Sequence, residues 1–193
     1  MVSAAERKLE RSFNAATELI NLAISRRRAR EKFPYWSYAF NSLILVESKT
    51  IPTMGVSHKM VCVYNRKFVE ETPLEVLVWV WVHEILHIIG KHAPRWAAVI
   101  GMADKSLDEV YDIVAMSNDL QVKAKLWNLA ADAAINQKLR SMCEEMNTRV
   151  AQAKQMSLPE DWIYPETFGL EEGNTAEFYY QELLKQLKEK KKP

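Results

Sequence analysis

The most hydrophobic stretch of the chain is residues 72–92, which read TPLEVLVWVWVHEILHIIGKH. Apolar side chains follow one another here with few interruptions, a pattern typical of a helix that is buried nearly all round. Thr72 and Glu75 have the spacing of a capping box, which predicts where this helix begins. Gly90 is the residue type that most often follows the last turn, so the helix is expected to end there.

The rest of the pattern predicts more helix than strand. Residues 60–64 are the clearest predicted strand, within a region, residues 50–64, that fits one or two short strands. Residues 35–47 are aromatic and then aliphatic, and they fit a buried helix and a strand equally well. Apolar spacing and capping residues predict further helices over residues 3–32, 106–116, 120–142 and 174–188.

Length and composition suggest one domain. The 193 residues fit a single domain over residues 1–193, with an N-terminal helix over residues 1–32 and a C-terminal extended segment and helix over residues 152–193. The 26 Lys and Arg residues nearly balance the 25 Asp and Glu residues, which argues against nucleic acid as the main partner. Cys62 and Cys143 lack C-x-x-C spacing, so neither a disulfide framework nor a cysteine zinc site is indicated.

The sequence contains no pattern typical of a signal peptide or of a membrane-spanning helix. The first residues, MVSAAERKLERSF, carry early charges and no apolar core, unlike a signal peptide. The longest apolar run, residues 76–82, is far shorter than the ~20 residues needed to cross a bilayer. We therefore expect a cytoplasmic protein that does not associate with a membrane.

Three polar residues interrupt the hydrophobic stretch in the order His-Glu-x-x-His: His83, Glu84 and His87. Positions four apart share one face of a helix, so both imidazoles can be aimed at one zinc ion. Glu84 would act as the general base on the water that the metal activates. Alternatively, the histidines could be hydrogen-bonded core residues with Glu84 at the surface. Because buried polar groups cost about 1–3 kcal/mol each unless satisfied, the metal interpretation is favoured.

A catalytic zinc site needs a third protein ligand. Asp132 lies among alanines in the sequence AADAAIN, which predicts a carboxylate that faces another helix, although a solvent-facing Asp would also fit. His92 is the competing candidate. On an unbroken helix it lies roughly 140° around the axis from His87, so only a break at Gly90 could bring it back. Metzincins use such a break, but with one residue more than the spacing found here.

Four stretches in this order resemble a known family: MGVSHKMVCVYNRKFVEE, HEILHIIGKHAPRW, LWNLAADAAIN and LPEDWIYPETFGLEEGNTAEFYYQELL, together spanning about residues 50–188. The chain is similar to the zincin-like metallopeptidase domain often found beside von Willebrand factor A-like domains in bacterial and phage proteins. The resemblance implies a zincin-like α+β fold, mostly helical, with a small mixed β-sheet beside the motif helix. It also implies that His83 and His87 are ligands, Glu84 the base and Asp132 the third ligand. Since the chain ends at Pro193, a stand-alone form is expected.

The leading hypothesis is thus a zinc-dependent peptidase that acts on a peptide or protein substrate. The strand over residues 60–64 could hold an extended substrate along its edge, or it could be an ordinary sheet strand. A second hypothesis is a catalytically silent, metal-containing module of the same fold that binds proteins. A third is a helical structural protein in which the motif occurs by chance.

Overall fold

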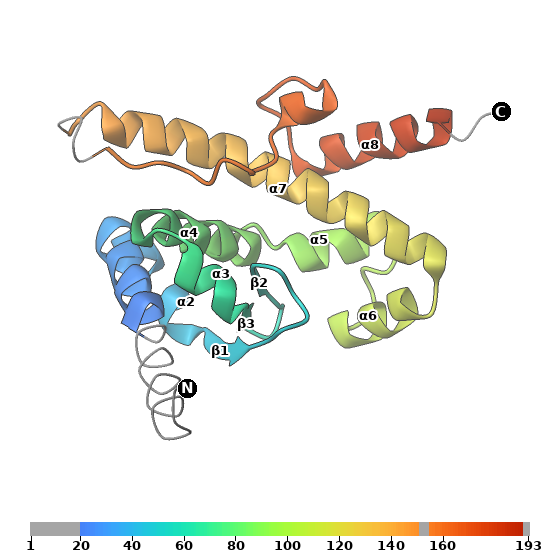
Figure 1. Ribbon diagram of the computed structural model, residues 1–193. Coiled ribbons are helices and arrows are strands. Elements are labelled where there is room, and N and C mark those ends of the chain that lie inside the picture. The colour runs from blue at the N-terminus through green and yellow to red at the C-terminus, as the bar shows by residue number, and fades with distance from the viewer. Residues whose placement is uncertain (1–19, 151–154, 191–193) are drawn as a thin grey trace, which may run out of the picture. The chain divides into compact units, whose positions relative to one another are not determined.

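The computed structural model describes residues 20–150 and 155–190. The chain forms two compact units, Met1–Ile85 and Leu86–Pro193. Residues 20–32 are helical, and the elements that follow are η1 (Pro34–Trp36), α2 (Ser37–Ser42), β1 (Ile44–Glu47), β2 (Met54–Val56), β3 (Val61–Tyr64), α3 (Arg66–Glu71), α4 (Leu74–Ile89), α5 (His92–Val99), α6 (Leu107–Ala115), α7 (Asn118–Asn147), η3 (Pro165–Phe168) and α8 (Ala176–Lys190) (Figure 1).

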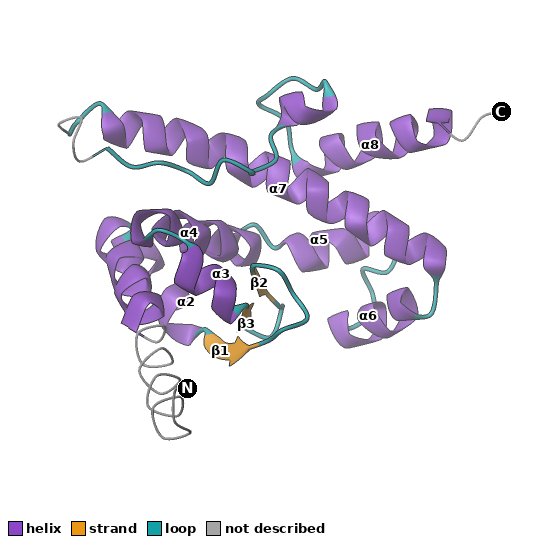
Figure 2. Cartoon of the chain, in the orientation of Figure 1, coloured by secondary structure: helices purple, strands orange, loops and turns teal. Residues whose placement is uncertain are grey.

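Among the described residues, helices dominate both units, and the strands all belong to the first (Figure 2). This confirms the expected mostly helical α+β fold with a small mixed sheet. The predicted helix over residues 3–32 lies partly outside the described residues, and its described part is helical. None of the helices in the described ranges is both long enough and apolar enough to cross a bilayer.

The sheet of the first unit has the strand order β1-β3-β2. β1 pairs with β3 in parallel, and β2 pairs with β3 in antiparallel orientation. The predicted strand over residues 60–64 is therefore confirmed as β3, but it is the central strand. Because its backbone groups are paired on both sides, it offers no free edge, and the hypothesis that it holds a substrate along its edge is wrong. In the part of the chain that the structure describes, β1 and β2 are the outer strands of this sheet.

Helix α4 forms the core of the first unit before it continues into the second. Its residues 77–82 are all at most 6% exposed. Trp81 donates a hydrogen bond from its indole N–H to the Ser25 hydroxyl, at 2.9 Å, which fastens α4 to the N-terminal helix. A helix so uniformly apolar is stable only when other elements cover it on all sides.

The start of α4 differs from the prediction. The residues before it form a separate helix, α3, whose first turn is capped by the Asn65 side chain, which accepts from the Phe68 N–H at 3.2 Å. Thr72 ends α3 instead of beginning α4. The Glu75 carboxylate pairs with Arg28. The predicted capping box of Thr72 with Glu75 is therefore wrong, because both residues have other partners.

The second unit is built on the long helix α7. Ser117 caps it by accepting from the Leu120 N–H, and α6 begins with the predicted capping box of Ser106 and Glu109. α8 lies beside the first half of α7 (Figure 1). Tyr180 on α8 packs against Trp127 on α7 with ring centroids 5.9 Å apart. Alanines on α7 permit this close approach, and four of them are buried in the core shared with α8: Ala130, Ala131, Ala133 and Ala134.

The segment between α7 and α8 returns along the second half of α7 (Figure 1). Asn147 holds one end of it through two hydrogen bonds, both 2.8 Å long, to the backbone of Met156. Further along, the Asn136 side chain donates to the carbonyl of Ile163 at 2.9 Å. The polar side chains of this half of α7 thus pair with backbone groups of the chain that precedes η3.

Candidate metal centre

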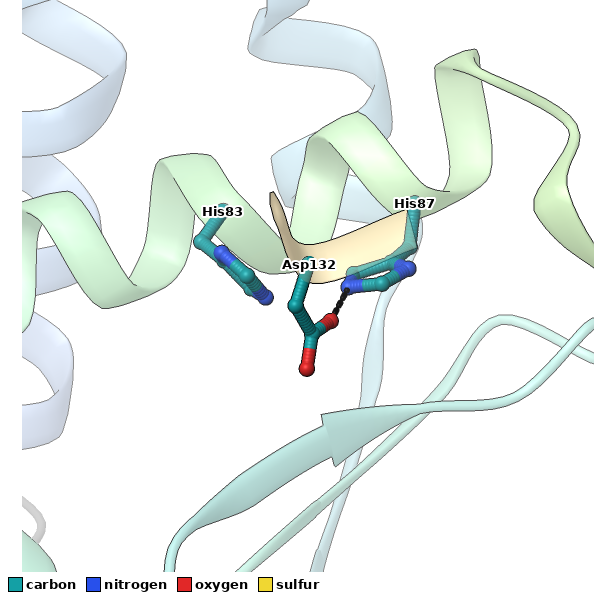
Figure 3. A group of neighbouring side chains, drawn as sticks. All are labelled: His83, His87 and Asp132. Carbon is teal, nitrogen blue, oxygen red and sulfur yellow. Dashed lines mark ion pairs between the residues drawn. The ribbon is translucent and has the colours of Figure 1, made fainter. Parts of the chain in front are cut away.

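Three predicted site residues come together. His83 and His87 lie one turn apart on α4, and Asp132 faces them from α7 (Figure 3). One ligand atom from each side chain lies within 4.8 Å of the other two, and all three residues are half-buried. The spacing of four between the histidines puts both on one face of α4, as the sequence predicts. The carboxylate comes from a position 45 residues beyond His87 in the chain.

His87 and Asp132 are already in contact. The Nε2 atom of His87 lies 3.0 Å from the Oδ1 atom of Asp132 (Figure 3). Their side chains are 20% and 31% exposed, so this pair is reached by solvent. The prediction that Asp132 faces another helix agrees with this contact, although its carboxylate is not sealed from water.

The donor set fits zinc. Two imidazole nitrogens and one carboxylate oxygen are a common ligand set of catalytic zinc sites, which leave one position open. Zinc bonds of about 2.0–2.2 Å place neighbouring ligand atoms about 3.4 Å apart in a tetrahedral site. The three ligand atoms, which lie within 4.8 Å of one another, are not far from this separation. His83, His87 and Asp132 could therefore hold such an ion.

Glu84 occupies a buried position next to the group. It is only 6% exposed, in the same turn of α4 as His83. Burial, together with the nearby Glu84 carboxylate, raises the pKa of the Cys62 thiol on β3. Glu84 therefore lies close to the central strand, and it does not belong to the three-residue group. The alternative in which Glu84 is a surface residue is wrong.

The chain does break after α4, as the competing candidate His92 would require. α4 ends at Ile89, Lys91 adopts a left-handed conformation with φ of 51°, and α5 begins at His92. The break turns the His92 ring back onto His87, where the two Nδ1 atoms lie 3.0 Å apart. His92 nevertheless stands outside the group of three, because it contacts the nitrogen of His87 that does not face Asp132.

His92 lies in surroundings that disfavour a positive charge. It is 7% exposed, and its ring meets the edge of Trp127. Burial lowers the pKa of His92 to about 3, and the neighbouring His87 and Arg95 side chains add to this effect. His92 is therefore a neutral imidazole near pH 7, able to donate from one nitrogen and to accept at the other.

Arg95 connects the turn before His92 to helix α8. Arg95 donates to the carbonyl of Gly90 at 3.0 Å and forms a two-pronged ion pair with Glu177, with one N–O distance of 2.6 Å. This ion pair, through hydrogen bonding from Arg95, lowers the pKa of Glu177 to about 2. This ion pair could not be predicted from the sequence, because Arg95 and Glu177 are 82 positions apart and neither belongs to a motif.

The matching family is consistent with this geometry. The model of a family described as "Putative metallopeptidase domain" matches residues 21–189. The chain belongs to this family. In this metallopeptidase family member, the matched region contains β1 to β3, the motif helix α4 and Asp132. Membership points to a metal-dependent peptidase that acts on peptides. No curated protein and no solved structure matches the chain.

Proposed function

We propose that this protein is a zinc-dependent peptidase in which His83, His87 and Asp132 hold the metal and Glu84 is the general base. The observation that carries the proposal is the convergence of two imidazoles and a carboxylate, from helices α4 and α7, within 4.8 Å. Such a cluster is costly to assemble unless a ligand repays its desolvation. The family match supports the same class of activity.

Each ligand side chain has a defined part in the proposal. His83 and His87 supply neutral nitrogen donors from one face of α4, and Asp132 supplies the negative charge that offsets part of the charge of the cation. Zinc at this position would polarise the scissile carbonyl and lower the pKa of a water molecule to about 7. The partial exposure of His87 and Asp132 leaves room for water and substrate beside them.

Glu84 would move the proton. Its carboxylate oxygen accepts the proton that water loses as it attacks the carbonyl carbon, and then gives this proton to the nitrogen of the leaving amine. A buried carboxylate at 6% exposure is shielded from bulk water, which favours transfer to a nearby reacting group over exchange with solvent. Its position in the turn that carries His83 keeps it next to the ligands.

The test compares Glu84→Gln with the wild type on a broad peptide library. The amide keeps the shape of the side chain but cannot take the proton, so we expect peptide hydrolysis to fall by at least about 100-fold while zinc binding is unchanged. Glu75→Gln, on the exposed start of the same helix, is the matched control and should cleave like the wild type. Equal cleavage by Glu84→Gln would remove Glu84 from the mechanism. Cleavage by none of the three proteins would instead favour a metal-containing binding module.

A further inference from the structure

The two ring nitrogens of His87 face different partners. Nε2 lies 3.0 Å from Oδ1 of Asp132, and Nδ1 lies 3.0 Å from Nδ1 of His92. The rings of His87 and His92 are nearly perpendicular, at 81°, with centroids 5.0 Å apart. The proposed ligand set accounts for the first contact and leaves the second, between half-buried His87 and buried His92, without a role.

We propose that His92 is a positioning residue of the metal centre: its Nδ1 accepts the Nδ1–H of His87, so that Nε2 of His87 is the nitrogen that binds the metal. This inference rests on the proposed function, because it assigns His87 as a ligand. The contact would fix both the rotation of the His87 ring and the nitrogen that carries its proton. Most metal-binding histidines are held in this way, commonly by a carboxylate or a carbonyl oxygen.

The donor and acceptor roles follow from the protonation of imidazole. A neutral imidazole carries one proton, so a His87 that binds a metal through Nε2 must carry its proton on Nδ1. Two Nδ1 atoms at 3.0 Å form a hydrogen bond only when one is protonated and the other is not. His92 must then be the Nε2–H tautomer, with a lone pair on Nδ1.

Direct ligation by His92 does not fit the same geometry. The two nitrogens of an imidazole point in diverging directions, and His92 meets His87 at the nitrogen away from Asp132. A metal between His87 and Asp132 therefore lies on the far side of the His87 ring from His92. The absence of His92 from the three-residue group agrees with this assignment.

The backbone turn before His92 allows the His92 ring to lie close to His87. A Cβ atom at Gly90 would lie 2.9 Å from Nε2 of His92 and 2.8 Å from the carbonyl oxygen of Leu86. Both distances are shorter than real carbon contacts allow, so only glycine permits the ring to come this close. Lys91 then reverses the chain with its positive φ. Gly90 thus permits the position of His92 in which its Nδ1 can accept a hydrogen bond from His87.

The first experiment measures zinc affinity of apo protein by competition with a chromogenic chelator. We expect His92→Phe, which keeps an aromatic ring but has no acceptor, to lose about 10- to 100-fold in affinity. His92→Asn places an amide oxygen near the position of Nδ1 and should recover most of this loss. Trp96→Phe, a packing change on the same helix, is the matched control and should bind like the wild type.

The outcomes separate this inference from the proposed function. A wild type that binds no zinc would contradict the proposed function itself. Wild-type binding with unchanged affinity in His92→Phe, or an equal loss in His92→Asn, would overturn only the positioning role. An equal loss in Trp96→Phe would likewise overturn it, since packing alone would then explain the effect.

A second measurement needs no variant and so cannot fail through misfolding. Long-range ¹H–¹⁵N spectra of the zinc-loaded wild type report which nitrogen of each histidine is protonated. We expect a protonated Nδ1 on His87 and an unprotonated Nδ1 on His92. A His92 that carries its proton on Nδ1 would overturn the proposal, whatever the affinities show.

Discussion

Nε2 of His87 on α4 lies 3.0 Å from Oδ1 of Asp132 on α7, although the two residues are 45 positions apart in the chain. This contact joins the helix that carries the motif to the helix that carries the acidic residue. It places an imidazole nitrogen beside a carboxylate oxygen. The same two atoms are the ones that would bind zinc.

Replacing Asp132 should therefore weaken zinc binding more than replacing His92. We expect Asp132→Ala to lose more zinc affinity than His92→Ala. The first change removes a ligand, whereas the second removes a contact to a ligand, and such a loss lowers metal affinity by about 10- to 100-fold. Titration of apo protein with zinc measures both. The reverse order would mean that His92 is a ligand after all.

Metal binding should also raise the resistance of the protein to heat. A ligand at 100 times its Kd that binds only the folded state adds about 2.7 kcal/mol to the free energy of unfolding. For a chain of this length, that corresponds to a Tm higher by roughly 5–10 °C. Differential scanning calorimetry with zinc and then with excess chelator measures the shift. His87→Ala should show none, and an equal shift in His87→Ala would place the metal elsewhere.

The ion pair of Glu177 with Arg95 should make stability depend on pH. Because the folded pKa of Glu177 is about 2, below its ordinary value of 4.5, its contribution is complete above pH 4.5 and is lost as the pH falls towards 2. Since both side chains are about a third exposed, we expect Glu177→Gln to cost only about 1 kcal/mol at pH 7. Urea unfolding at several pH values measures this cost, which should vanish near pH 2. A cost that is the same at pH 7 and pH 2 would contradict the assignment.

Gly90→Ala should disturb the turn between α4 and α5. Its Cβ would meet the Leu86 carbonyl and the His92 ring, and overpacking of this kind costs about 1–3 kcal/mol. We also expect a lower zinc affinity, because His92 must move away from His87. Gly55→Ala is the control, since a Cβ there meets nothing within 4 Å. Unchanged stability and affinity in Gly90→Ala would show that the close approach of His92 is not needed.

Much of the site could be predicted from local patterns. The spacing of His83 and His87 specifies one helix face, and Gly90 specifies where that helix ends, because both depend only on neighbouring residues. Asp132 could be singled out because a carboxylate among alanines is unusual on a buried helix face. The capping box of Ser106 is a signal of the same local kind.

Other features depend on partners that the sequence does not reveal. The capping box expected at Thr72 competes with α3, which ends there, and with Arg28, which takes the Glu75 carboxylate. The place of β3 at the centre of the sheet depends on how three short strands pair. The contact of His92 with His87 depends on the left-handed turn at Lys91, which a residue other than glycine seldom adopts.

The most direct test of the account is the metal content of protein prepared without a histidine tag in the presence of zinc. Elemental analysis by mass spectrometry should give close to one zinc per chain for the wild type. His83→Ala, His87→Ala and Asp132→Ala should each fall well below this value. A wild-type content well below one per chain would contradict the metal centre, and with it the proposed peptidase.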